Sequence, residues 1–176
     1  MRYLKNTIEF EGKKYYLTWI PGNSYEEFSP IKQAYGFCFD KNGRLLVGQN
    51  DFNIWQVMGG TVEFGETPEE TLIRELDEEV NIEVERITYL GAQKIVDDIG
   101  QISYQLRYGA IISKLKQRKP DPCNGKIMKR KFIDPRLYGR ISGWGLIGDS
   151  IVDEAIKKLF GAAGETRTLT PFDTST

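Results

Sequence analysis

Alternating apolar and polar positions fill the first fifty residues and predict paired strands. The first alternation predicts a hairpin in which Thr7–Phe10 pairs with Lys14–Ile20. Two further apolar runs, Gln33–Phe39 and Arg44–Gln49, flank the turn-forming residues 40–43. Because Asp, Asn and Gly favour tight turns, these runs are predicted to be two core strands joined by a hairpin turn.

The strand pattern returns after residue 53. Residues Ile54–Met58 predict a short strand that leads into a glycine-rich loop at Gly59-Gly60. Beyond residue 82, Glu83–Val96 and Ile102–Leu115 predict a long hairpin, and Lys126–Ile133 predicts one more strand.

Between the strands at Ile54–Met58 and Glu83–Val96 the apolar period changes from two to about 3.6, which predicts a helix over residues 68–80. Thr67 is a good N-cap, Pro68 suits the first helical position, and Glu70 completes a capping box. Asn81 tolerates positive φ and can close the helix. The expected buried stripe consists of Leu72, Ile73, Leu76 and Val80.

A second amphipathic helix is predicted over Asp149–Phe160, with Gly161 as its stop. Its expected apolar side consists of Ile151, Val152, Ala155, Ile156 and Leu159. Residues 162–176 are rich in threonine and lack periodicity, so we expect a disordered tail there.

The order of strands, helix, strands, helix predicts an α+β fold in which the two helices cover a mixed sheet. With 176 residues and 40% apolar content, the chain is long enough for one domain with a sizeable core. We therefore expect a single domain over residues 1–161.

Composition narrows the chemistry and the compartment. A net charge of −1 argues against a general electrostatic binder of nucleic acid or membranes. There is no long apolar run and the first residues do not resemble a signal peptide, so we expect a cytoplasmic protein. Cys38 and Cys123 are expected to be reduced, buried thiols. The absence of histidine excludes Ser-His and Cys-His catalytic pairs, which leaves carboxylates to carry any chemistry.

Three such carboxylates share one face of the first predicted helix. Glu75 lies three residues before Glu78 and four before Glu79, whereas Asp77 points elsewhere. Two like charges about 5 Å apart repel by roughly 3 kcal/mol at an effective dielectric near 20. The cluster must therefore be solvated, protonated or bound to a cation, and oxygen ligands of this density suit a hard divalent ion such as Mg²⁺ or Mn²⁺.

The surrounding spacing favours the cation. Residues 60–82 resemble the Nudix box, Gly-x5-Glu-x7-Arg-Glu-U-x-Glu-Glu-x-Gly-U, in which U is apolar. The matching positions are Gly60, Glu66, Arg74-Glu75-Leu76, Glu78-Glu79 and Ile82. Asn81 stands in place of the closing glycine, a change that a left-handed cap can accommodate. Met58 stands where many relatives carry proline. Neither departure removes a carboxylate.

The resemblance implies an α/β/α sandwich, a divalent metal and hydrolysis of a nucleoside diphosphate linked to another moiety. It implies that Glu78 and Glu79 are the main metal ligands and that Glu75 is a ligand or the base acting on water. The Gly60 carbonyl would be a further ligand, and Arg74 would pair with Glu66 to orient the helix. Without the box spacing, that last pair would be read as a surface ion pair worth under about 1 kcal/mol.

Outside the box the sequence leaves several assignments open. Candidates for an additional carboxylate are Asp97, Asp98 and Asp121, and candidates for stacking on a base are Trp55, Tyr104 and Phe37. A basic cluster could guide phosphates or RNA, or be a solvated hairpin; it consists of Lys114, Lys116, Arg118, Lys119, Lys126, Lys129, Arg130 and Lys131.

The leading hypothesis is thus a Mg²⁺-dependent pyrophosphohydrolase acting on a nucleoside triphosphate or another nucleoside diphosphate derivative. The expected partner is a small nucleotide substrate, and no membrane is expected. A nucleic acid is not expected as a partner either, except that a capped or triphosphate RNA end is not excluded as a substrate. The alternatives are a catalytically silent nucleotide sensor, expected to lack box carboxylates, and an isopentenyl-diphosphate isomerase, which needs Cys and His residues. Both fit these residues less well.

Overall fold

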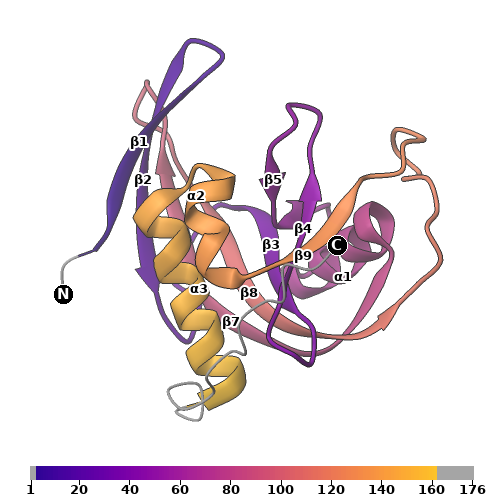
Figure 1. Cartoon of the computed structure of the whole chain (residues 1–176). Coiled ribbons are helices and arrows are strands. Elements are labelled where there is room, and N and C mark those ends of the chain that lie inside the picture. The colour runs from indigo at the N-terminus through magenta and orange to yellow at the C-terminus, as the bar shows by residue number, and fades with distance from the viewer. Residues whose placement is uncertain (1–2, 162–176) are drawn as a thin grey trace.

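The computed structural model describes residues 3–161, in which a nine-stranded sheet carries three α-helices (Figure 1). The strands are β1 Lys5–Phe10, β2 Lys13–Pro21, β3 Ile31–Phe39, β4 Leu45–Gln49, β5 Trp55–Gln56, β6 Met58–Thr61, β7 Ile82–Val96, β8 Ile102–Leu115 and β9 Arg130–Ile133. The helices are α1 Pro68–Val80, α2 Tyr138–Ser142 and α3 Gly145–Phe160, with a 3₁₀ turn at Pro135–Leu137. The expected disordered tail, residues 162–176, lies outside the described residues.

The sheet is mixed, as its predicted class requires. Its order is β1-β2-β7-β8-β3-β4-β5, with β6 paired to β3 and β9 paired to β4. The pair β3–β8 is parallel and the others are antiparallel. The predicted hairpins β1–β2 and β7–β8 are confirmed. The turn between β3 and β4 also forms, but the two strands pair only at Phe39 and Leu45, because β3 pairs mainly with β8 and β6.

Two hydrophobic layers form on the two faces of the sheet, because successive residues of a strand point to opposite sides. Along β3, Phe37 and Phe39 belong to the layer under α3, whereas Ala34 and Cys38 belong to the layer under α1. Figure 1 shows α3 in front of the sheet and α1 behind it. The predicted α+β sandwich is therefore confirmed.

Helix α1 has the predicted bounds and caps. Thr67 accepts a hydrogen bond from Glu70 N at 3.2 Å, the Glu70 carboxylate accepts from Thr67 N at 2.8 Å, and Asn81 ends the helix at φ 53°. The predicted buried stripe is wrong at one position, since Ile73 is 51% exposed and Thr71 is buried instead. Ile73 lies about 100° around the helix from Leu72, beyond the strip that contacts the sheet.

Replacing Glu70 by alanine should test the capping box separately from any chemistry. Because Glu70 supports only the N-terminus of α1, the expected loss is about 1 kcal/mol or less of unfolding free energy, with turnover nearly unchanged. Urea denaturation and a turnover assay on the same preparation measure both quantities. A large fall in turnover without loss of stability would contradict a purely structural role.

Other boundaries differ from the sequence prediction. Gly59 and Gly60 are part of strand β6 rather than of a loop. Strand β9 covers only the last four residues of the predicted 126–133 strand, and α3 begins four residues earlier than expected. Helix α2 was not predicted because it is a single short turn with too few residues to show a period. No helix among residues 3–161 is long and apolar enough to cross a membrane.

Candidate functional site

The site begins where strand β6 passes the side of α1. Gly60 has no side chain, and the carboxylate of Glu75 occupies the space beside it: an ideal Cβ on Gly60 would lie 2.1 Å from Glu75 Oε1. One strand position earlier, Gly59 N donates a hydrogen bond to Glu79 Oε2 at 3.1 Å. The two glycines therefore allow the sheet edge to approach the acidic face of the helix closely.

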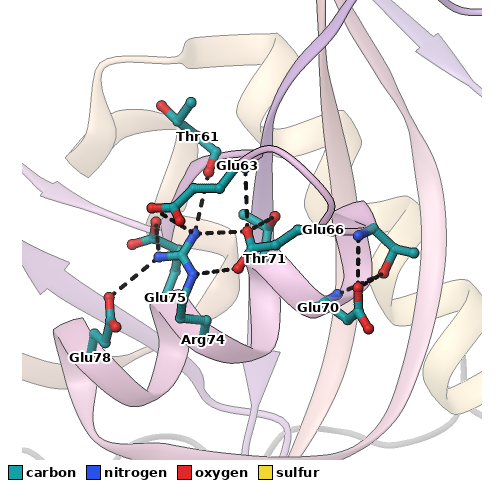
Figure 2. A network of polar contacts seen from close by, with 9 residues as sticks. Thr61, Glu63, Glu66, Glu70, Thr71, Arg74, Glu75 and Glu78 are labelled. Carbon is teal, nitrogen blue, oxygen red and sulfur yellow. Dashed lines mark hydrogen bonds and ion pairs between the residues drawn. The ribbon is translucent and has the colours of Figure 1, made fainter.

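Arg74 lies between the carboxylates of this face (Figure 2). As the box spacing implied, its Nε donates to Glu66 Oε1 at 2.7 Å and its Nη2 donates to Glu66 Oε2 at 3.0 Å. In addition, Nη1 donates to Glu75 Oε1 at 2.9 Å and to Glu78 Oε2 at 3.3 Å. The sequence did not indicate these last two contacts. Arg74 thus offsets part of the like-charge repulsion within the cluster.

Glu66 orients this arginine and is itself tightly held. Besides Arg74, the Thr71 hydroxyl donates to Glu66 Oε2 at 2.7 Å. These hydrogen bonds to the charged carboxylate lower the pKa of Glu66 to about 2. Glu66 therefore stays ionised at neutral pH and fixes the guanidinium by a two-pronged contact.

The electrostatics differ sharply for Glu79. Burial, followed by the charge of Glu75, raises the pKa of Glu79 to about 8, and the Gly59 hydrogen bond opposes this shift only in part. Burial also raises the pKa of Glu75, against the effect of Arg74. A partly buried carboxylate that keeps its proton near neutral pH lacks a positive partner, which is the condition under which a cation binds favourably.

Among the three aspartates that the sequence left unranked, Asp121 is the one beside the site. Asp121 and Glu79 line one hollow of about 380 Å³, and the charge of Asp121 contributes to the raised pKa of both Glu75 and Glu79. Its carboxylate also accepts hydrogen bonds from Cys123 N at 2.7 Å and Asn124 Nδ2 at 3.0 Å. Asp97 instead shapes the turn between β7 and β8 by accepting from Ile99 N and Gln101 N.

The residues present suit a hard divalent cation by their chemistry. The donor set is carboxylate oxygen, the type that Mg²⁺ and Mn²⁺ prefer, and the missing side chain at Gly60 leaves a cradle around Glu75. Among residues 3–161, however, no three acidic, histidine or cysteine side chains already converge as a cation cage. Arg74 separates Glu75 from Glu78, so side-chain rearrangement is needed to assemble one.

Several members of the predicted basic cluster have local polar partners. Lys116 pairs with Asp77 at 2.6 Å, and Lys126 pairs with Asp51 at 2.8 Å. Arg130 donates to the backbone carbonyls of Val80 and Asn81 and so covers the C-terminal end of α1. The cysteine prediction is confirmed for Cys38, which is buried, and wrong for Cys123, which is exposed in the loop that carries Asp121; both are free thiols.

A second hollow, of about 480 Å³, lies on the α3 face of the sheet. Of the three aromatic residues proposed from the sequence, only Phe37 lines it. Trp55 packs under Lys131 Nζ at 4.1 Å, and Tyr104 stacks on Phe28 at 4.7 Å. The sequence did not indicate Tyr35, Arg107 and Trp144, which do line this hollow. Strand alternation alone does not identify the buried face for Tyr35 and Arg107, and Trp144 lies between α2 and α3, where α2 was not predicted.

Comparison with known proteins identifies a family and a curated relative. A sequence model of the NUDIX domain family matches residues 31–137, more than half of the chain. The 8-oxo-dGTP diphosphatase of Proteus vulgaris is 37% identical over 62 residues, which cover 32% of this chain and 55% of that protein. The chain thus spans about half the length of this curated relative.

Among solved structures, a variant of the Bacillus subtilis pyrophosphohydrolase BsRppH superposes with a TM-score of 0.64 at 20% identity, covering 91% of this chain and 96% of that one. The MutT protein of Bacillus halodurans superposes with a TM-score of 0.52 at 20% identity, covering 68% of this chain and 80% of that one. At this level of identity the likeness concerns the fold.

Proposed function

The chain belongs to the NUDIX domain family, and from this premise we propose that it is a Mg²⁺-dependent hydrolase that cleaves a pyrophosphate bond in a nucleoside triphosphate or another nucleoside diphosphate derivative. The observation that carries the proposal is the acidic face of α1 held against Gly59 and Gly60 of β6. The names of the relatives, a diphosphatase and a pyrophosphohydrolase, support the same reaction class.

Glu75, Glu78 and Glu79, together with the Gly60 carbonyl, would hold the cation. When bound, it supplies neutralisation of the pyrophosphate charge and a water of lowered pKa. The protein supplies orientation: Glu66 holds Arg74 by two hydrogen bonds, and Arg74 in turn contacts Glu75 and Glu78. Asp121, which lines the same hollow as Glu79, would accept a proton from the attacking water.

A silent nucleotide sensor is the second candidate, and the retained side chains favour the enzyme. Loss of catalysis would be expected to remove at least one of the box carboxylates, but Glu66, Glu75, Glu78 and Glu79 are all present. We further expect the protein to work in the cytoplasm on a small nucleotide, with a capped or triphosphate RNA end as a further substrate to test.

The decisive experiment is a Mg²⁺-supplemented screen of nucleotides and nucleotide conjugates, with the products identified by mass. An enzyme releases a monophosphate and a second phosphate-bearing product, whereas a sensor binds without turnover. Parallel reactions with EDTA, and with Glu78→Gln protein, serve as controls for contaminating phosphatases. Equal turnover with and without EDTA would contradict the proposal.

Metal should also stabilise the folded protein. Because a cation relieves repulsion that exists only when the carboxylates are held together, we expect the Tm to rise as Mg²⁺ or Mn²⁺ increases into the millimolar range. Differential scanning calorimetry with Mg²⁺, Mn²⁺ and EDTA measures the shift, and NaCl of matched ionic strength controls for screening. An unchanged Tm would count heavily against the metal site.

A further inference from the structure

Arg107, on β8, is an arginine whose surroundings do not balance its charge. It is 3% exposed, and none of the ion pairs among residues 3–161 includes it. Its Nη2 donates to Gln105 Oε1 at 2.7 Å, and its Nη1 donates to Leu106 O at a long 3.5 Å. Since arginine has five N–H donors, most of its donor capacity has no partner in this part of the chain.

Aromatic rings hold this guanidinium in place. Its central carbon lies 4.7 Å from the centre of the Tyr35 ring and 5.5 Å from the centre of the Trp144 ring. These contacts orient a cation but do not accept N–H hydrogen bonds in the plane of the guanidinium. Burial of a charge is unfavourable when most of its N–H donors lack an acceptor, so a ligand that offers acceptors would relieve this cost.

The hollow on the α3 face gives such a ligand room. Arg107, Gln105 and Gln33 are among its polar residues, while Phe37, Tyr138 and Trp144 are among its aromatic ones. With one cation and extensive ring surface, this lining suits a planar heterocycle with acceptor atoms better than a phosphate, which generally needs several donors or cations.

The hollow is also placed to share a substrate with the acidic face of α1. In the sheet register, Arg107 lies opposite Tyr35, and Tyr35 lies opposite Gly59, whose N–H binds Glu79. The backbones of Arg107 and Gly59 are two strand spacings of about 4.8 Å apart, roughly 10 Å in all, so a substrate would pass from the α3 face to the α1 face around the edge strand β6. Gln56, just before β6, lines both the hollow on the α3 face and the hollow beside Glu79.

We propose that Arg107 is a specificity-determining residue that donates hydrogen bonds to the acceptor edge of a keto purine seated in the hollow on the α3 face. This inference rests on the proposed function, because it places the nucleoside of the substrate while its phosphates face α1. An arginine offers donors only, so it matches the O6 and N7 acceptors of a 6-keto purine. Adenine has an amino donor in place of O6 and would oppose the same guanidinium.

The test compares the binding of IMP and AMP, two nucleotides that differ in the group at position 6 of the purine. Calorimetric titration of the metal-free protein in EDTA measures the affinity of each. We expect the wild type to bind IMP about tenfold more tightly than AMP, in the range typical of a paired arginine–base contact. Arg107→Met should bring the two affinities together, mainly by weakening IMP. Arg44→Met is the control, because Arg44 stacks on Phe132 at 4.8 Å away from the hollow; it should keep the preference.

Two further measurements control for unfolding of the variant and for binding through the phosphate alone. If circular dichroism shows that Arg107→Met is unfolded, Arg107→Gln replaces it; its amide offers both a donor and an acceptor, matches either base, and should also lose the preference. Ribose 5-phosphate and inorganic phosphate should bind much more weakly than IMP. Equal wild-type affinity for IMP and AMP, a preference kept in the Arg107 variant, or ribose 5-phosphate binding as tight as IMP binding would each overturn the proposal.

The binding test and the turnover screen can fail separately. If the protein hydrolyses nucleotides but its base preference does not depend on Arg107, the proposed function stands and this inference is wrong. If the protein prefers IMP through Arg107 but hydrolyses no nucleotide, this inference stands and the proposed hydrolase activity is wrong.

Discussion

Glutamine at position 79 should lower turnover by two or more orders of magnitude while leaving the metal-free protein folded. Glu79→Gln keeps the size and helix propensity of the side chain but removes the charge that a cation would need. Metal-assisted steps contribute several kcal/mol to transition-state stabilisation, and about 1.4 kcal/mol corresponds to a tenfold change in rate. We expect a similar fall for Glu78→Gln. Wild-type rates in both variants would show that the proposed site is wrong.

The same substitution should change how stability depends on pH. Glu79 has a pKa of about 8 in the folded protein and an ordinary value near 4.5 when unfolded. Between these values the folded state retains a proton that the unfolded state releases, so the stability of the wild type falls as pH rises, by at most about 1.4 kcal/mol per unit from this group. Above pH 8 the loss is complete. Glu79→Gln lacks this group, so its advantage over the wild type should grow from pH 5 to 8.

Urea denaturation in EDTA across that pH range measures the difference in slope. Asp77→Asn is the matched control, because Asp77 is on the same helix but pairs with Lys116 instead of contacting β6. It should retain both the wild-type turnover and the wild-type slope. Parallel stability curves for Glu79→Gln and the wild type would contradict the raised pKa.

Alanine at position 60 should give the second large effect, a fall in turnover of about 100-fold with the fold retained. The new Cβ would lie 2.1 Å from Glu75 Oε1, so this carboxylate must move. It is the far end of a flexible side chain, and its displacement should cost about 1 kcal/mol or less of stability. A catalytic group displaced by about 1 Å can lower the rate about 100-fold.

The neighbouring glycines supply the controls for this prediction. Gly59→Ala would bring a Cβ to 2.1 Å from Ala34 O and 2.6 Å from Tyr35 Cα, where backbone cannot yield, so we expect a loss of more than about 3 kcal/mol. A Cβ on Gly65 meets nothing within 4 Å, and Gly65→Ala should cost only about 1 kcal/mol through its positive φ. Turnover assays and urea denaturation of all three variants separate the effects; wild-type turnover in Gly60→Ala would contradict the position assigned to Glu75.

Local signals explain which features could be predicted from the sequence. The bounds of α1 follow from Thr67, Pro68 and Asn81, which act within one helical turn of the ends. The clustering of Glu75, Glu78 and Glu79 follows from helical spacing alone. By contrast, Arg107, Tyr35 and Gly59 lie in one row of the sheet only because β3 pairs with β8 and β6, and pairing between distant strands leaves no mark in the sequence of any one of them.

Asn81 carries a consequence for protein engineering. Its side chain donates from Nδ2 to Asp77 O at 2.7 Å and accepts at Oδ1 from Lys119 N at 2.9 Å, at the start of the segment that leads to Asp121. The glycine that the family pattern prescribes would satisfy the left-handed backbone but remove both hydrogen bonds. Consensus design, which restores the common residue at each unusual position, would therefore weaken the attachment of this segment to the end of α1 while appearing to repair the motif, and only backbone contacts such as Lys116 N to Asn81 O and the Arg130 contacts would remain.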